Sequence, residues 1–517
     1  MPADAPARSP AGSPAPSPAR SPGPSSHRPP ALALAALSVA VFAAALALRL
    51  TGLGAAAVSL DEVYTQFAVS RDWGGMVLDR AGRGHMPTYF ALAKLSVPDV
   101  TDLAALRRPG AVADAAAAAI LAGGIGRLAG LPAGLWAGAL YATGPAFVIW
   151  AQNARPYGLL MAFLALGLVA AMALVRNGAR DRRAAGAFAL GWSGAAFTLT
   201  GGILAYLSVV LTPRLRGGPL AEPGFRRRWR RAALVPSVVA GFAYLAVSRP
   251  HVYEGGVGGF WVEKYRPFGL QSLAELAGDL AGGQLRDLAP LLPPVPEAAV
   301  LAALVAALAA FAVAGARRAG ADPALWPVIG LALGFPAVMI AASAVSSLLI
   351  DRYFLPFWAA VLVLAAIGLA RLPALPQALA GGALVAVSGA FALASALAAP
   401  GPGPGYPRIA AAIEGSGHGD ARILAGELFI DLRRDILSLR LDATSLPRPD
   451  MDGARPERLS AALEAGAPAF LAVTPDEWRR TYRALLPPAP CGLRTERGVL
   501  VWLGASGCPA PLAPLAE

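Results

Sequence analysis

The chain has 517 residues, of which 56% are hydrophobic and only 15% are charged. Soluble chains carry about 25% charged residues, so the composition excludes an ordinary soluble enzyme and predicts an integral membrane protein. The net charge of +12 does not indicate nucleic-acid binding, because the arginines cluster between apolar segments and form no long basic face. Two cysteines and four histidines exclude a cysteine-rich metal site, so a zinc site would have to use carboxylates.

The N-terminal residues 1–30 repeat Ser-Pro and Ala-Pro with scattered arginines. This composition cannot bury a core, so it predicts a disordered cytoplasmic tail. Residues 31–50 are apolar and long enough for a first membrane span. The alternative is a cleavable signal peptide with a small-residue site at Ala55-Ala56-Ala57, but the apolar run is long for one. Either way, the acidic residues that follow lie beyond the membrane.

Residues 51–105 are polar and predict an irregular loop, with one short amphipathic helix at 87–97 that is interfacial or re-entrant. The segment 184–212 is interpreted as two short helices bent at Thr200-Gly201-Gly202, in preference to one long span. The total is about eleven spans, which makes the fold class an all-α polytopic membrane protein. The apolar runs after the first lie at 106–128, 131–150, 157–175, 184–199, 201–212, 232–248, 297–315, 325–349, 353–371 and 377–399.

The arginines indicate the orientation of the chain, because cytoplasmic loops carry an excess of Lys and Arg. With the N-terminus in the cytoplasm, every arginine-rich loop is cytoplasmic, whereas one long span at 184–212 would place the run 226–231 outside. An odd number of spans then places the C-terminus outside, in a multi-pass protein of the plasma (inner) membrane. The cytoplasmic arginines are Arg176, Arg180, Arg182, Arg183, Arg214, Arg216, those of 226–231, Arg317, Arg318 and Arg371.

Residues 400–517 follow a Pro-Gly linker and change in character. Helical patterns at 409–413 and 475–485 and strand patterns at 422–424, 469–473 and 498–503 predict a small extracytoplasmic α/β domain. Cys491 and Cys508 can form one disulfide if this domain lies outside the cytoplasm.

The polar clusters that are not arginine-rich all fall on the outer side in this topology. This segregation predicts a site at the outer membrane–water boundary, within the transmembrane domain 31–399 and its two long loops, 51–105 and 249–296. A route through the bilayer would instead place ionisable residues in its middle. The clusters are Asp61-Glu62, residues 84–89, residues 152–157, the loop 249–296 and Asp351-Arg352-Tyr353.

Each cluster carries residue types with a definite chemistry. Asp61 beside apolar surface suits a general base, although it could also be an ordinary helix cap. Arg155 and Arg352 each open a span beside a tyrosine, Tyr157 and Tyr353, and guanidinium groups bind phosphate in a fork; the alternative is a pair of interfacial anchors.

Two further residues are candidates for binding. His85 could hold a metal or a sugar hydroxyl, although a lone histidine commonly does neither. Lys264 lies in a loop that mixes aromatic and charged residues, which suits a sugar or an extended acceptor and equally suits a solvated loop.

Four of these segments, in order, resemble GT-C glycosyltransferases of the branch that holds protein O-mannosyltransferases and the lipid A aminoarabinose transferase. Asp61-Glu62 resembles the acidic pair of the first extracytoplasmic loop. Residues 84–90 are similar to the His-Pro-Pro-Leu-Tyr-Tyr segment, with Met86 and Thr88 departing from it. Residues 151–157 resemble Ala-Gln-Glu-Ala-Arg-Pro-Tyr, with Asn153 in place of Glu, and residues 352–356 resemble Arg-Tyr-x-x-Pro. The likeness covers about residues 31–399; residues 198–201 lack the histidine that relatives often carry there.

The resemblance implies a glycosyltransferase that moves a hexose or pentose from a polyprenyl-phosphate donor to a lipid, glycan or protein hydroxyl outside the membrane. It implies that Asp61 deprotonates the acceptor, that Glu62 is a supporting or acceptor-side group, and that Arg155 and Arg352 hold the departing phosphate. Some relatives use a divalent metal; with only His85 and Glu62 nearby, no metal site is assigned. The alternatives are a transporter or flippase, for which Asp114 is the clearest acid within a span, a glycan ligase with the same chemistry, and a non-catalytic scaffold.

Overall fold

The computed structural model of the chain describes residues 29–55, 59–100, 102–212, 221–249, 269, 271–272, 276, 297–318, 321–343, 349–397, 405–418, 421–425, 469–473, 475, 478–484, 486, 490–495, 499–504 and 507–515. The predicted tail, except its last two residues, and most of the loop 249–296, with Lys264, lie outside this part of the chain.

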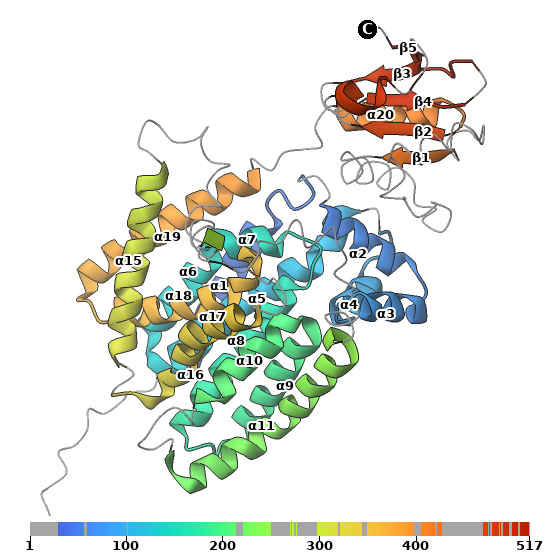
Figure 1. Ribbon diagram of the computed structural model, residues 1–517. Helices are drawn as coiled ribbons and strands as arrows, with labels where there is room; N and C mark the ends of the chain where they lie inside the picture. The colour runs from blue at the N-terminus through green and yellow to red at the C-terminus, as the bar shows by residue number, and fades with distance from the viewer. Residues whose placement is uncertain are drawn as a thin grey trace, which may run out of the picture.

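A bundle of apolar helices forms the first part of the protein (Figure 1). Its centre is a buried cluster rich in Ala and Leu, where α5, α8 and α9 pack together. Among the described residues, seven helices are long and apolar enough to cross a membrane. The helices are α1 (Ala31–Leu50), α5 (Leu103–Ala129), α6 (Leu131–Thr143), α7 (Pro145–Ala151), α8 (Tyr157–Arg176), α9 (Arg182–Thr198), α10 (Thr200–Val210), α11 (Pro223–Ala243) with η3 (Tyr244–Ser248), α15 (Glu297–Arg317), η6 (Pro323–Leu325), α16 (Trp326–Ile329), η7 (Gly330–Gly334), α17 (Phe335–Ser343), η8 (Asp351–Phe354), α18 (Leu355–Leu369) and α19 (Ala374–Leu397).

The segment 184–212 is a pair of helices, as expected. Leu199 is extended, with φ −157° and ψ 146°, and it separates α9 from α10 one residue before the expected bend. The ring of Tyr206 on α10 contacts those of Phe188 and Trp192 on α9, at centroid distances of 6.3 and 5.9 Å. A continuous helix would hold residues 192 and 206 about 21 Å apart, so the chain reverses at Leu199. The run expected at 131–150 is also broken, at Gly144, into α6 and α7.

The arginine-rich loops meet at one end of the bundle. Arg228 donates from Nε to the carbonyl of Gly178 at 2.7 Å, and Arg176 pairs with Asp322 at 2.6 Å. These contacts bring the loop after α8, the start of α11 and the loop before α16 together. The side of the membrane on which this end lies stays a prediction.

The first long loop, expected to be irregular outside 87–97, is mostly helical, so that expectation was wrong. It contains α2 (Leu60–Ser70), α3 (Trp73–Gly82) and α4 (Thr88–Ser96). Ser59 and Asp72 cap α2 and α3 by accepting hydrogen bonds from backbone N–H groups, which satisfies donors that a helix start leaves open. Lys94 on α4 donates to the carbonyls of Val69 and Arg71 and so joins α4 to the end of α2 and to the link between α2 and α3. These capping signals are present in the sequence, but the polar composition of the loop obscured them.

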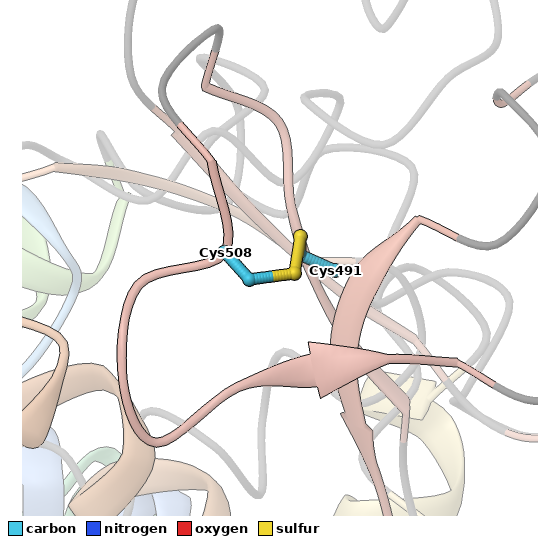
Figure 2. The surroundings of a disulfide bond; sticks show 2 residues. All are labelled: Cys491 and Cys508. Atoms are coloured by element: carbon cyan, nitrogen blue, oxygen red, sulfur yellow. A yellow bond between two sulfur atoms is a disulfide. The ribbon is translucent and has the colours of Figure 1, made fainter.

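The C-terminal part is an α/β unit, as predicted. Its sheet has the order β1-β2-β4-β3-β5, with β1 and β2 parallel and the other pairs antiparallel. Ile409 and Ile413 of α20 pack on Phe470 and Trp502 of the sheet. Cys491 and Cys508 form a disulfide with Cα atoms 5.2 Å apart (Figure 2). The elements are α20 (Gly405–Gly415), β1 (Arg422–Ala425), β2 (Ala469–Val473), η9 (Trp478–Tyr482), β3 (Cys491–Arg494), β4 (Val499–Trp502) and β5 (Ala513–Pro514), of which β3 and β5 were not expected.

Candidate active site

The start of α2 positions the two adjacent acids. Ser59 accepts from the backbone N–H of Glu62 at 3.3 Å, and the Glu62 carboxylate accepts from the N–H of Ser59 at 2.9 Å. This reciprocal capping box holds both acids in the first turn, where the positive end of the helix favours them. Because consecutive helical residues point in different directions, Asp61 and Glu62 have different surroundings.

Glu62 is fully buried and hydrogen-bonded from several sides. Arg107 on α5 reaches both of its oxygens, at 2.6 Å from Nε and 2.8 Å from Nη2. The backbone N–H of Ala154 donates to the same carboxylate at 2.8 Å. Glu62 therefore connects α2, α5 and the turn between α7 and α8, and its carboxylate does not face an open acceptor space.

Asp61 lies next to Arg352, although 291 positions separate them in the chain. The Nη1 of Arg352 is 3.4 Å from Oδ2 of Asp61, and the two side chains are 21% and 19% exposed. The guanidinium also lies over the rings of Trp150 and Tyr353, with 5.4 and 5.7 Å to the centroids. At 3.4 Å, with about one-fifth of each side chain exposed, this is a partly buried ion pair that solvent can reach.

Arg155 lies in the turn before α8 and is 5% exposed. Its Nη1 donates to the backbone carbonyl of Asp61 at 3.4 Å. Its Nε is buried and has no hydrogen-bond partner among the described residues. A buried guanidinium with an open donor is costly unless an anion completes it, so this group is suited to bind one.

Three polar side chains of the site lie around the ring of Phe90 on α4. Arg155 lies 6.0 Å and Arg80 5.3 Å from its centroid, and the ring of His85 is 6.3 Å away. Arg80 is buried and pairs with Asp79. Two cations beside one aromatic face strengthen the positive potential around the Asp61 turn.

Asp79 balances part of this charge, since Arg71, Arg80 and Arg83 all pair with it. Burial acts to raise the pKa of the Asp79 carboxyl, but the hydrogen bonds and charges of Arg80 and Arg83 outweigh it and hold that pKa below its usual value.

The tyrosines differ in exposure. Tyr157 is buried, its ring 5.1 Å from that of Trp150, and it lies within the electrostatic reach of Arg352, Arg155 and Asp61. Tyr353 is half-buried beside Arg352. The structure thus brings together Asp61, Arg155, Tyr157, Arg352 and Tyr353, with His85 next to them; Lys264 lies outside the described residues.

The described residues do not form a metal site. They contain no group of three His, Cys, Asp or Glu side chains placed to hold an ion. Of the two candidate ligands, Glu62 is hydrogen-bonded by Arg107, and the ring of His85 lies tilted beside that of Phe90 with centroids 6.3 Å apart. The described residues therefore do not fit a metal, and no chemical step is derived through one.

Several residues of this region were missed from the sequence. Arg107 and Arg80 were not singled out, although arginines that interrupt apolar or amphipathic helices are signals of buried pairs. The same holds for Arg49 at the end of α1, which donates to Asp114 at 2.7 Å while the Tyr141 hydroxyl donates to the other oxygen at 2.7 Å. Asp114, the acid that a transporter would use, is thus held in a buried pair that joins α1, α5 and α6.

The site and the arginine-rich loops lie at opposite ends of the bundle. Helix α8 begins at Tyr157 in the site and ends at Arg176, and its 20 residues span about 30 Å, the thickness of the hydrocarbon core.

No protein-family model and no curated protein matches the chain. Solved structures do. ArnT from Cupriavidus metallidurans bound to undecaprenyl phosphate has a TM-score of 0.59 at 15% identity, covering 90% of this chain and 98% of that one, and its apo state has a TM-score of 0.57. The archaeal oligosaccharyltransferase AglB from Archaeoglobus fulgidus, in complex with an inhibitory peptide and a dolichol-phosphate, has a TM-score of 0.54 at 12% identity, covering 93% and 75%. At these identities the likeness shows the fold alone: the chain has the GT-C polytopic membrane fold.

Proposed function

We propose that this protein is a membrane glycosyltransferase that moves a sugar from a polyprenyl-phosphate donor to an acceptor hydroxyl. The observation that carries the proposal is the 3.4 Å approach of Arg352 to Asp61, with Arg155 on the backbone of the same aspartate. The proposed base is thereby in contact with two cations that can bind a phosphate. The structures with this fold include one bound to undecaprenyl phosphate and one bound to a dolichol-phosphate, which supports a lipid-phosphate donor.

The reaction assigns one role to each group. The acceptor oxygen forms a bond to the anomeric carbon of the sugar as the bond from that carbon to the phosphate oxygen breaks. Asp61 takes the hydroxyl proton, and the departing polyprenyl phosphate keeps the electron pair. Arg352 and Arg155 stabilise the charge that develops on it. Donor binding replaces the contact between Arg352 and Asp61, which leaves the carboxylate open to the acceptor.

Glu62 has a positioning role in this proposal. Its carboxylate is fully occupied by Arg107 and two backbone N–H groups, so it holds the Asp61 turn against the Arg155 turn. We place the site on the extracytoplasmic side, because the arginine-rich loops gather at the opposite end and the Cys491–Cys508 disulfide suits an oxidising compartment.

The test uses the purified chain, a panel of undecaprenyl-phosphate hexoses and pentoses as donors, and cell-envelope material as the source of acceptor. Release of undecaprenyl phosphate is measured. We expect Asp61→Asn to lower the rate about 100- to 10,000-fold, the range for loss of a general base. Asp72→Asn, a change of the same type at an exposed cap in the same loop, is the control and retains the wild-type rate. Full activity in Asp61→Asn would remove Asp61 as the base.

A further inference from the structure

The start of α11 carries a second charged feature, far from the proposed active site. Four arginines line a groove of about 460 Å³ at the arginine-rich end of the bundle, with Pro223 and Leu234 completing its wall. The arginines are Arg226, Arg227, Arg230 and Arg231.

The two faces of α11 have different roles. Its inner face is anchored to the bundle: Trp229 is buried, packs against Phe188 with ring centroids 5.2 Å apart, and donates to the carbonyl of Val210. Arg228 fastens the same face to Gly178. The four groove arginines lie on the outer face, and their side chains have no ion pair or hydrogen bond within the described part of the chain.

This arrangement is unfavourable without an anion. Arg226 and Arg230, and likewise Arg227 and Arg231, are four residues apart on one helix, where like charges repel. The positive-inside rule explains how many arginines the loop carries, since it depends on their number and not on their direction. It does not explain why four of them share one open face. A phosphate group bound by several guanidinium forks would offset the repulsion.

The surface below the arginines indicates which kind of anion fits. The same side of α11 continues into the membrane span as an exposed apolar stripe, in which Leu234, Val238 and Phe242 are 62%, 63% and 59% exposed. Helix α11 lies at the outside of the bundle (Figure 1), so this stripe is available to lipid chains. A phospholipid would contact both parts of this surface, with its headgroup among the arginines and its acyl chains along the apolar stripe. A soluble anion would contact only the arginines.

We propose that this groove is a binding site for an anionic phospholipid, with the headgroup phosphate held by Arg226, Arg227, Arg230 and Arg231 and the acyl chains lying along α11. Basic clusters at the end of a membrane helix attract acidic lipids. The specific claim here is that lipid binding depends on these four residues and exceeds the effect of the general positive charge at this end.

The test measures the thermal unfolding midpoint of the full chain in neutral detergent with added dioleoylphosphatidylglycerol, because a ligand that binds the folded state raises that midpoint. The test variant replaces all four groove arginines by glutamine. The control variant replaces four other exposed arginines of the same end, Arg182, Arg183, Arg317 and Arg318, by glutamine, so the net charge is the same in both. If the fourfold test variant does not fold, R226Q/R230Q replaces it, with R182Q/R183Q as the control of equal charge.

We expect phosphatidylglycerol to stabilise the wild type and the control alike, and to bind the groove variant at least about tenfold more weakly. Phosphatidylcholine should stabilise none of the three, and inorganic phosphate should not compete with the lipid. An equal loss in the control variant would overturn the proposal, because general surface charge would then suffice. So would unchanged binding by the groove variant, and displacement of the lipid by inorganic phosphate would show a site for a soluble anion instead.

Discussion

A single guanidinium, that of Arg107, holds both carboxylate oxygens of Glu62, and the side chains of this ion pair are 2% and 0% exposed. The pair joins α2 to α5, and the N–H of Ala154 adds the turn that carries Arg155. One buried acid thus holds together the two turns from which the proposed base and one phosphate-binding cation project.

Removing one member of this pair should destabilise the fold. We expect Glu62→Met to cost about 3–5 kcal/mol of unfolding free energy, because it leaves the buried Arg107 charge without its counterion. The double variant E62M/R107M should recover much of that loss, since no charge remains buried. Chemical denaturation of both variants checks this. A single variant as stable as the wild type would contradict the structural role.

Replacing Arg352 should affect the chemical step. We expect Arg352→Gln to lower kcat about 100- to 1000-fold, the cost of losing one group that stabilises a developing anion. The kcat of Arg352→Lys should lie between those of Arg352→Gln and the wild type, because a lysine keeps the charge but loses the two-pronged hydrogen bonding of the guanidinium. The control is Arg83→Gln, at an arginine in the loop 51–105 whose side chain is half-exposed, which should retain kcat. A change in KM alone would place Arg352 in ground-state binding.

The contribution of Asp79 to stability should depend on pH. Arg80 and Arg83 hold its pKa below the usual value in the folded state, so the unfolded chain binds the proton more readily. The ion pairs of Asp79 therefore stabilise the fold above about pH 4, and this stabilisation is lost as the pH falls below that value. We expect the stability difference between the wild type and Asp79→Asn to be constant from pH 5 to 7 and to shrink below pH 4. A difference that grows on acidification would contradict the sign.

The crossing of α5 and α8 should not tolerate a larger residue. A Cβ at Gly158 would lie 2.2 Å from the carbonyl oxygen of Gly110, so the two backbones would have to separate. We expect Gly158→Ala to cost about 1–3 kcal/mol and to lower activity, because Tyr157 and Arg155 precede it. Gly186→Ala is the control: it lies in α9 with open space around its Cβ position, and it should be neutral or slightly stabilising. Comparison of thermal midpoints and activity checks both.

Local patterns in the sequence were sufficient for the helices and for the grouping of charges. The apolar runs predicted the membrane helices, because a chain in lipid must satisfy its own backbone hydrogen bonds. Arginine placement favoured a reversal near Thr200, and the contacts of Tyr206 with Phe188 and Trp192 confirm it. Residues 51–105 were harder, since their three helices have only 11, 10 and 9 residues, too few to show a clear helical period in the sequence.

The sequence by itself determined that the chain crosses a membrane, and it identified Asp61, Arg155 and Arg352 as unusual polar residues at helix starts. Only the tertiary structure decided how the two adjacent acids divide their roles. Asp61 and Glu62 look alike in the sequence. Because consecutive residues of a helix point in different directions, Glu62 contacts Arg107 in the core, whereas Asp61 contacts Arg352. That division depends on contacts across 45 and 291 positions of the chain, and such contacts leave no local pattern in the sequence.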